Sequence, residues 1–101
     1  MTQVKVCSLD VIPIGSMKQF YLGEREFLII NLNGQFYCLD ARCTHAGAPL
    51  AEGTLDGEVL TCPWHGSQFR ITNGVVLKGP AEKELKAYPV TVRDNFIFVE
   101  I

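Results

Sequence analysis

The stretch Cys43-Thr44-His45-Ala46-Gly47 and the later stretch Cys62-Pro63-Trp64-His65-Gly66 each place a cysteine close to a histidine. The chain contains two histidines, and both stand in these two stretches. Thiolates are soft ligands and imidazoles are suited to several transition metals, so both residue types bind such metals in proteins. Glycine in both stretches, with Pro63 in the second and Pro49 two residues after the first, is typical of loops. The sequence therefore predicts two loops that offer four metal ligands, namely Cys43, His45, Cys62 and His65.

The spacing of the four ligands separates several kinds of site. The pattern is Cys-X-His, sixteen intervening residues and Cys-X2-His. Zinc fingers use the same residue types, but they usually pair cysteine with cysteine and histidine with histidine. A cysteine protease needs one nucleophile with one base, so a second matched pair would have no role. Chance packing of buried cysteines is disfavoured because both histidines take part. A [2Fe–2S] cluster with two cysteines on one iron and two histidines on the other would need one ligand of each type from each loop.

The rest of the chain has the pattern of an all-β protein. Segments rich in β-branched and aromatic residues alternate in part with turn signals, and they are residues 3–7, 17–22, 25–32, 35–40, 58–62, 68–72, 75–78, 88–93 and 96–101. Dipeptides such as Asn33-Gly34 and Asp94-Asn95 favour hairpins. Helix is expected only as a turn within residues 49–53. We predict one domain over residues 1–101, an antiparallel β-sandwich or small barrel with two metal-binding loops.

The composition limits the kinds of partner. Of 101 residues, 48% are hydrophobic and 20% are charged, and the net charge is −2. Interleaved charges of this size give no reason to expect nucleic acid or an anionic membrane as a partner. No apolar run approaches the roughly 20 residues that span a bilayer, and the first residues lack the pattern of a signal peptide. We therefore expect a soluble, cytoplasmic protein with no membrane anchor and no nucleic-acid partner.

The two loops carry a resemblance to a known family. The residues Cys43-Thr44-His45-Ala46-Gly47 and Cys62-Pro63-Trp64-His65-Gly66-Ser67 resemble the two cluster loops of Rieske proteins. The resemblance implies one [2Fe–2S] cluster. By the same resemblance the two cysteines bind a buried iron and the two histidines bind an outer iron. The segments Gly79-Pro80-Ala81 and Tyr88-Pro89-Val90 are similar to the third loop and returning strand of small, soluble Rieske ferredoxins.

Departures from the family's respiratory and photosynthetic members point to the same subgroup. Those members carry an extra cysteine in each loop, joined as a disulfide, where this chain has Ala48 and Trp64. They also carry a tyrosine two residues after the serine that this chain keeps as Ser67, and here that position is Phe69. The chain therefore resembles the low-potential Rieske ferredoxins of aromatic-ring dioxygenase systems.

This resemblance implies an electron carrier and not an enzyme. We expect a reductase as the electron donor and an oxygenase or similar enzyme as the acceptor, with His45 and His65 at the exit on the loop tips. A mononuclear iron of the oxygenase type would need two further histidines and a carboxylate, and both histidines are already used. Two alternatives stay open at this point. One is a small Rieske subunit of a multi-component oxidoreductase such as assimilatory nitrite reductase, and the other is a cluster-free or zinc-bound interaction module.

Several residues near the loops have more than one expected role. Trp64 is expected to shield the cluster from water, to stack beneath its loop or to be purely structural. Ser67 is expected either to hydrogen-bond a cluster sulfur or to stabilise the turn, and Pro80 is expected to shape the third loop. Cys7 and Cys38 lie in predicted strands, where buried packing is favoured over a disulfide between them.

Overall fold

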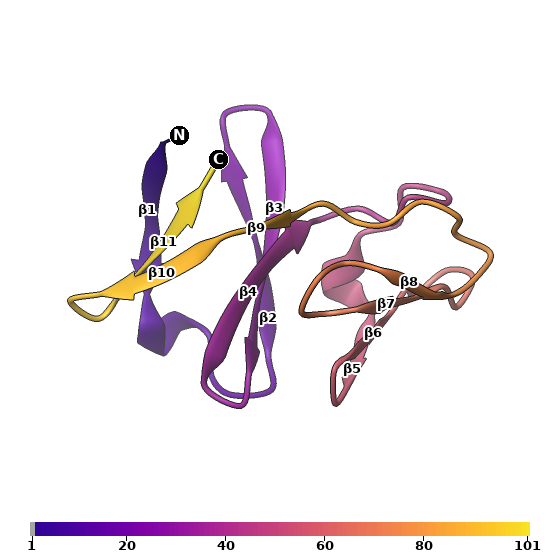
Figure 1. The fold of residues 1–101 in the computed structure, drawn as a ribbon, viewed down its shortest axis with the longest axis horizontal. Helices are drawn as coiled ribbons and strands as arrows, with labels where there is room; N and C mark the ends of the chain where they lie inside the picture. Colours follow the sequence, from indigo (N-terminus) through magenta and orange to yellow (C-terminus); the bar gives the residue numbers. More distant parts are fainter. Residues whose placement is uncertain (1) are drawn as a thin grey trace.

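Two of the three antiparallel sheets form one side of the molecule in the computed structural model, which describes residues 2–101 (Figure 1). The first sheet has the order β1-β11-β10 and consists of β1 (Gln3–Ser8), β11 (Phe96–Glu100) and β10 (Val90–Arg93). The second has the order β2-β3-β4-β9 and consists of β2 (Met17–Leu22), β3 (Arg25–Leu32), β4 (Gln35–Asp40) and β9 (Ala87–Tyr88).

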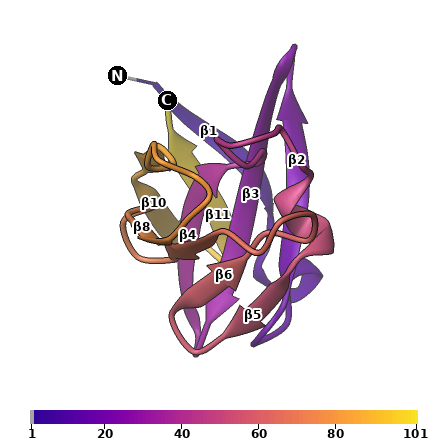
Figure 2. The same ribbon diagram turned by 90° about the vertical axis from the view of Figure 1, so that its right-hand side faces the viewer.

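The third sheet lies on the other side of the β2-β3-β4-β9 sheet, as Figures 1 and 2 show together. Its order is β5-β6-β7-β8, and it consists of β5 (Thr54–Asp56), β6 (Val59–Thr61), β7 (Gln68–Arg70) and β8 (Val76–Lys78). Two short 3-10 turns complete the regular structure of residues 2–101, namely η1 (Leu9–Val11) and η2 (Leu50–Glu52). No helix among these residues is long and apolar enough to cross a membrane.

The predicted all-β, antiparallel fold is confirmed, although residues 2–101 form no closed barrel. The turn expected within residues 49–53 is η2. Two elements were missed, η1 and β5, because each has three residues and too few positions to show a periodic pattern. The predicted strand 88–93 is divided into β9 and β10 at Pro89, because proline has no N–H to continue a ladder.

Two hairpins follow directly from their turn residues. Asn33 and Gly34 have φ angles of 54° and 93°, and Asp94 and Asn95 have φ angles of 53° and 66°. Positive φ at both central residues is the type I′ geometry, whose twist matches that of the flanking strands. The β3–β4 and β10–β11 pairings are therefore fixed in register by these dipeptides.

Strand β3 lies between two separate cores. Leu28 and Ile30 belong to a first core, which extends to the β5-β6-β7-β8 sheet and the predicted metal loops. Phe27 and Ile29 belong to a second core, which includes residues of β4, β9 and β11. Alternate residues of a strand face opposite sides, so a run of apolar residues in β3 supplies both cores. The middle sheet thus supports the loops on one face and the β1-β11-β10 sheet on the other.

Candidate metal centre

The two predicted loops have closely similar backbone geometry. Each has six residues, Cys43–Ala48 and Cys62–Ser67. In each loop the N–H of the first residue donates to the carbonyl oxygen of the sixth, with N–O distances of 2.9 Å and 2.8 Å. The fifth residue of each is a glycine with positive φ, 73° at Gly47 and 77° at Gly66, a conformation that glycine adopts without steric cost. The sequence therefore builds two matched turns.

The four predicted ligands divide into a buried pair and an exposed pair. Cys43 and Cys62 are 3% and 4% exposed and lie in the first core. His45 and His65 are exposed, with ring centroids 5.0 Å apart and ring planes at 85°. Two buried thiols and two adjacent, exposed imidazoles form the donor set that a Rieske cluster uses. The residues present therefore fit such a cluster.

The arrangement differs from a site for one metal ion. Within residues 2–101, no three His, Cys, Asp or Glu side chains converge closely enough to hold a single ion. A Rieske cluster takes only two protein ligands at each iron. Its ligands therefore form two pairs and do not need to meet at one point.

The segment after β8 packs against both loops. The Ser67 side chain is fully buried, and its Oγ accepts a hydrogen bond from the Ala81 N–H at 3.0 Å. On the first loop, the Thr44 hydroxyl donates to the Lys83 carbonyl oxygen at 2.5 Å. This Ser67 hydrogen bond joins the second loop to the segment that follows β8, and the two roles expected for Ser67 from the sequence stay predictions. Thr44 was not singled out from the sequence because its partner lies 39 residues away.

The remaining predicted site residues lie in different environments. Phe69 on β7 is fully buried in the first core, which also holds the two loop cysteines. Pro80 is exposed and lines a shallow hollow of about 410 Å³ beside His45. Trp64 is 57% exposed, and the roles expected for it stay predictions. Only the two ends of this loop are buried, whereas its tip at residues 63–65 is exposed, and the indole lies on that tip.

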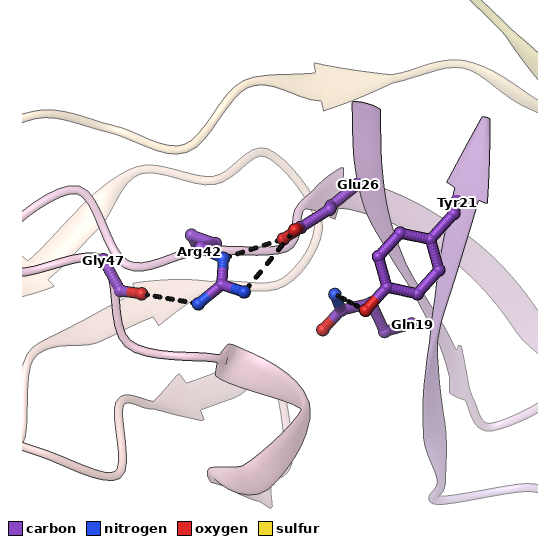
Figure 3. Close-up of polar contacts among 5 residues, drawn as sticks. All are labelled: Gln19, Tyr21, Glu26, Arg42 and Gly47. Atoms are coloured by element: carbon purple, nitrogen blue, oxygen red, sulfur yellow. Dashed lines mark hydrogen bonds and ion pairs between the residues drawn. The ribbon is translucent and has the colours of Figure 1, made fainter. Parts of the chain in front are cut away.

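Sequence reasoning also missed an ion pair at the first loop. Arg42 Nε lies 2.7 Å from Glu26 Oε2, and Arg42 Nη1 donates to the Gly47 carbonyl oxygen at 3.1 Å (Figure 3). The hydrogen bond to Glu26 and the negative charge of Glu26 raise the pKa of Arg42 above its usual value. The only signal in the sequence was an arginine beside the first cysteine, and nothing indicated which of the acidic residues would pair with it.

The other two cysteines have packing roles, as predicted. Cys38 is buried in the second core, and Cys7 is half-buried against it. Both are free thiols. Burial, with a smaller contribution from the charge of Asp40, raises the pKa of Cys38 to about 12. A thiol with so high a pKa is neutral and unreactive at ordinary pH.

Comparison with known proteins decides the family. The sequence matches the Rieske [2Fe-2S] domain family over residues 2–89. The chain belongs to the Rieske family. This membership supports a [2Fe–2S] cluster as the cofactor.

Relatives of this Rieske protein match it over nearly its full length. The "3-phenylpropionate/cinnamic acid dioxygenase ferredoxin subunit" of Photorhabdus laumondii is 32% identical over 102 residues, which cover 100% of this chain and 96% of that protein. The solved structure of Sphingomonas yanoikuyae B1 ferredoxin has a TM-score of 0.92 at 28% identity and covers 99% of each chain. A chain in the complex of reduced oxygenase and oxidized ferredoxin in carbazole 1,9a-dioxygenase has a TM-score of 0.89 at 32% identity, covering 96% of this chain and 91% of that one.

Proposed function

We propose that this Rieske protein is a one-electron carrier that accepts electrons from a reductase and passes them to an oxygenase or a similar terminal enzyme. The observation that carries the proposal is the pair of exposed imidazoles, 5.0 Å apart, on the same two loops as two buried thiols. Relatives named as dioxygenase ferredoxin subunits support it. So does the solved complex of reduced oxygenase and oxidized ferredoxin in carbazole 1,9a-dioxygenase.

The ligand assignment follows the burial of the four side chains. Cys43 and Cys62 hold the inner iron, and His45 and His65 hold the outer one. When bound, the cluster supplies a one-electron redox centre whose histidine ligation gives a higher potential than ligation by cysteine alone. The first core shields the thiolates from water. The exposed histidines give a partner protein direct access to the site, and the chain itself transforms no substrate.

We also propose that residues 1–101 form a single Rieske domain. Residues beyond the family match still belong to the same sheets, since β11 pairs with β1 on one side and with β10 on the other. Met1 lies outside the described residues. The cytoplasmic location and the absence of a nucleic-acid partner stay predictions from the sequence.

The first experiment is chemical and spectroscopic. The purified protein is expected to contain about two irons and two acid-labile sulfides per chain. After reduction it is expected to give an electron paramagnetic resonance spectrum with an average g below that of all-cysteine clusters. Each proposed ligand is then replaced in turn, and the iron content of each variant is measured; the variants are Cys43→Ser, Cys62→Ser, His45→Ala and His65→Ala. The control is Cys38→Ala, which removes a buried cysteine that is not a proposed ligand. Zinc in place of iron, or loss of iron in the control alone, would contradict the assignment.

The second experiment tests the carrier role. The reduced protein is mixed with the reductase and oxygenase of an aromatic-ring dioxygenase system, and substrate turnover is measured with and without it. Turnover that depends on this protein is expected. Isolation from cells in a fixed stoichiometry with a larger oxidoreductase would instead favour the alternative of a subunit such as that of assimilatory nitrite reductase.

A further inference from the structure

We infer that Arg42 is a positioning residue of the metal centre. Its guanidinium is anchored by Glu26 on β3, holds the first loop at the Gly47 carbonyl oxygen and places a positive charge beside that loop. The inference rests on the proposed cluster site. It concerns two side chains that are not ligands.

The contacts form a continuous connection from the sheet to the loop. Arg42 Nε and Nη2 lie 2.7 Å and 3.4 Å from the two carboxylate oxygens of Glu26, and Nη1 donates to the Gly47 carbonyl oxygen at 3.1 Å. Figure 3 shows the guanidinium between Glu26 and Gly47. A guanidinium presents its donors in a planar fork, so one side chain can bind a carboxylate and a carbonyl at fixed angles. Among residues 2–101 this is the only salt bridge.

The local backbone makes this contact possible. Strand β4 ends at Asp40, and two residues later Arg42 pairs with Pro49 in an isolated antiparallel bridge at the base of the loop. Gly47 has a φ of 73°, and its N–H donates to the Cys43 carbonyl oxygen at 2.9 Å. Arg42 therefore binds the carbonyl of the glycine on which the turn geometry depends.

The first loop is held from two sides. Arg42 holds it at Gly47, and the Thr44 hydroxyl holds it at the Lys83 carbonyl oxygen. His45 lies between Thr44 and Gly47 in the sequence and is itself exposed. An exposed ligand has few packing contacts to fix its orientation. The two anchors on either side of His45 therefore provide this constraint.

The ion pair is also oriented with respect to the loop. Its guanidinium binds the loop, and its carboxylate comes from β3. A positive charge nearby favours the addition of an electron by Coulomb attraction. The side chains of Arg42 and Glu26 are 52% and 27% exposed, so the effect is modest and is screened by salt. Removal of either charge should therefore shift the midpoint potential, in opposite directions for the two residues.

The test uses the iron-loaded protein at low ionic strength and compares Arg42→Gln, Arg42→Lys, Glu26→Gln and the double variant with wild type. The matched control is Arg93→Gln, which removes the same charge from β10 in the sheet on the other side of the molecule (Figure 1). Three quantities are measured. They are the midpoint potential, the paramagnetic resonance spectrum of the reduced protein and the hydrogen exchange rates of the Cys43 and Gly47 amides.

The expected pattern separates charge from positioning. Arg42→Gln lowers the potential and Glu26→Gln raises it, whereas both accelerate exchange of the loop amides by roughly two- to fivefold, as loss of a half-exposed pair allows. Arg42→Lys retains the charge but not the fork, so the potential stays close to wild type while exchange still accelerates. The double variant has a near-normal potential and fast exchange. Arg93→Gln changes none of the three quantities.

Two outcomes would overturn the inference. One is that Arg42→Gln matches Arg93→Gln in potential, spectrum and exchange. The other is that the two single variants shift the potential in the same direction. If Arg42→Gln does not fold, Arg42→Lys and Glu26→Gln decide the matter through exchange. Absence of iron from wild type would contradict the proposed function instead, and the exchange rates would still report whether Arg42 holds the loop.

Discussion

Replacing Ser67 by alanine removes the contact between the second loop and the segment that follows β8. The Ser67 side chain is fully buried, and its Oγ accepts the hydrogen bond of the Ala81 N–H at 3.0 Å. Ala81 is itself only 4% exposed. In Ser67→Ala this N–H would therefore lack both a protein partner and access to bulk water.

The size of the effect follows from that burial. A buried donor left without a partner costs about 1–3 kcal/mol of folding free energy. In a domain of this length, 1 kcal/mol corresponds to a shift of about 4–8 °C in the unfolding midpoint. With a central value of about 2 kcal/mol, the midpoint of Ser67→Ala is expected to fall by about 8–16 °C.

Thermal unfolding followed by circular dichroism and visible absorption measures this shift. All proteins are heated at one scan rate, because loss of the cluster makes unfolding irreversible and the midpoint dependent on the rate. The control is Ser16→Ala, which removes an exposed hydroxyl that donates to the Pro13 carbonyl oxygen at 2.7 Å. Such a surface change is expected to alter stability by about 0.5 kcal/mol or less.

Two readouts of Ser67→Ala carry different information. A midpoint that falls no further than that of Ser16→Ala would refute the argument from the Ala81 hydrogen bond. The midpoint potential tests the other expected role of Ser67, since a hydroxyl that also donates to a cluster sulfur would raise the potential. A lower potential in Ser67→Ala would indicate this donation, and an unchanged potential would leave only the structural contact.

Three further substitutions test other parts of the structure. Gly74→Ala places a Cβ against the Leu85 carbonyl oxygen at a residue with positive φ. The urea concentration at its unfolding midpoint should fall further than that of the control Gly23→Ala. At Gly23 the new Cβ meets open space, so that variant has only the backbone strain of positive φ, about 1–2 kcal/mol. The pKa of Cys38 is about 12 in the folded protein against an ordinary value of 9.0. The buried neutral thiol therefore makes its full contribution to the free energy of unfolding below pH 9, and this contribution is lost as the pH rises toward 12. In urea unfolding, Cys38→Ala should make the free energy of unfolding fall less steeply over this pH range. Phe69→Tyr should raise the midpoint potential by tens of millivolts in voltammetry if the new hydroxyl donates to a thiolate, and an unchanged potential would show that it does not reach one.

Local patterns explain which parts of the fold could be predicted. Asn33-Gly34 predicts the β3–β4 hairpin because both residues accept positive φ. The two Cys/His pairs predict two matched loops because glycine and proline accompany them. In contrast, β5 was missed because its three residues gain their strand geometry from pairing with β6. The sequence of a short edge strand contains little of the information that fixes it.

The side chains around the site depend on contacts between distant segments, and these were not predictable. The exposure of Trp64 depends on how far its loop projects from the sheet, and the neighbouring residues do not determine this distance. Ser67 meets Ala81 only because the segment after β8 returns across the second loop. A polar residue in a turn has many possible partners, and only the fold selects one.

The location of Glu26 on β3 explains how the Arg42 contact can hold the first loop in place. Glu26 directly precedes the residues of β3 that fill both cores, and Phe27, Leu28, Ile29 and Ile30 are all at most 2% exposed. A strand buried on both faces opens less readily than a loop or a surface strand. Arg42 therefore connects the exposed first loop to one of the most tightly packed elements of the molecule. A loop that had to hold a metal ligand in solvent would gain most from such a connection, because its own residues provide little packing.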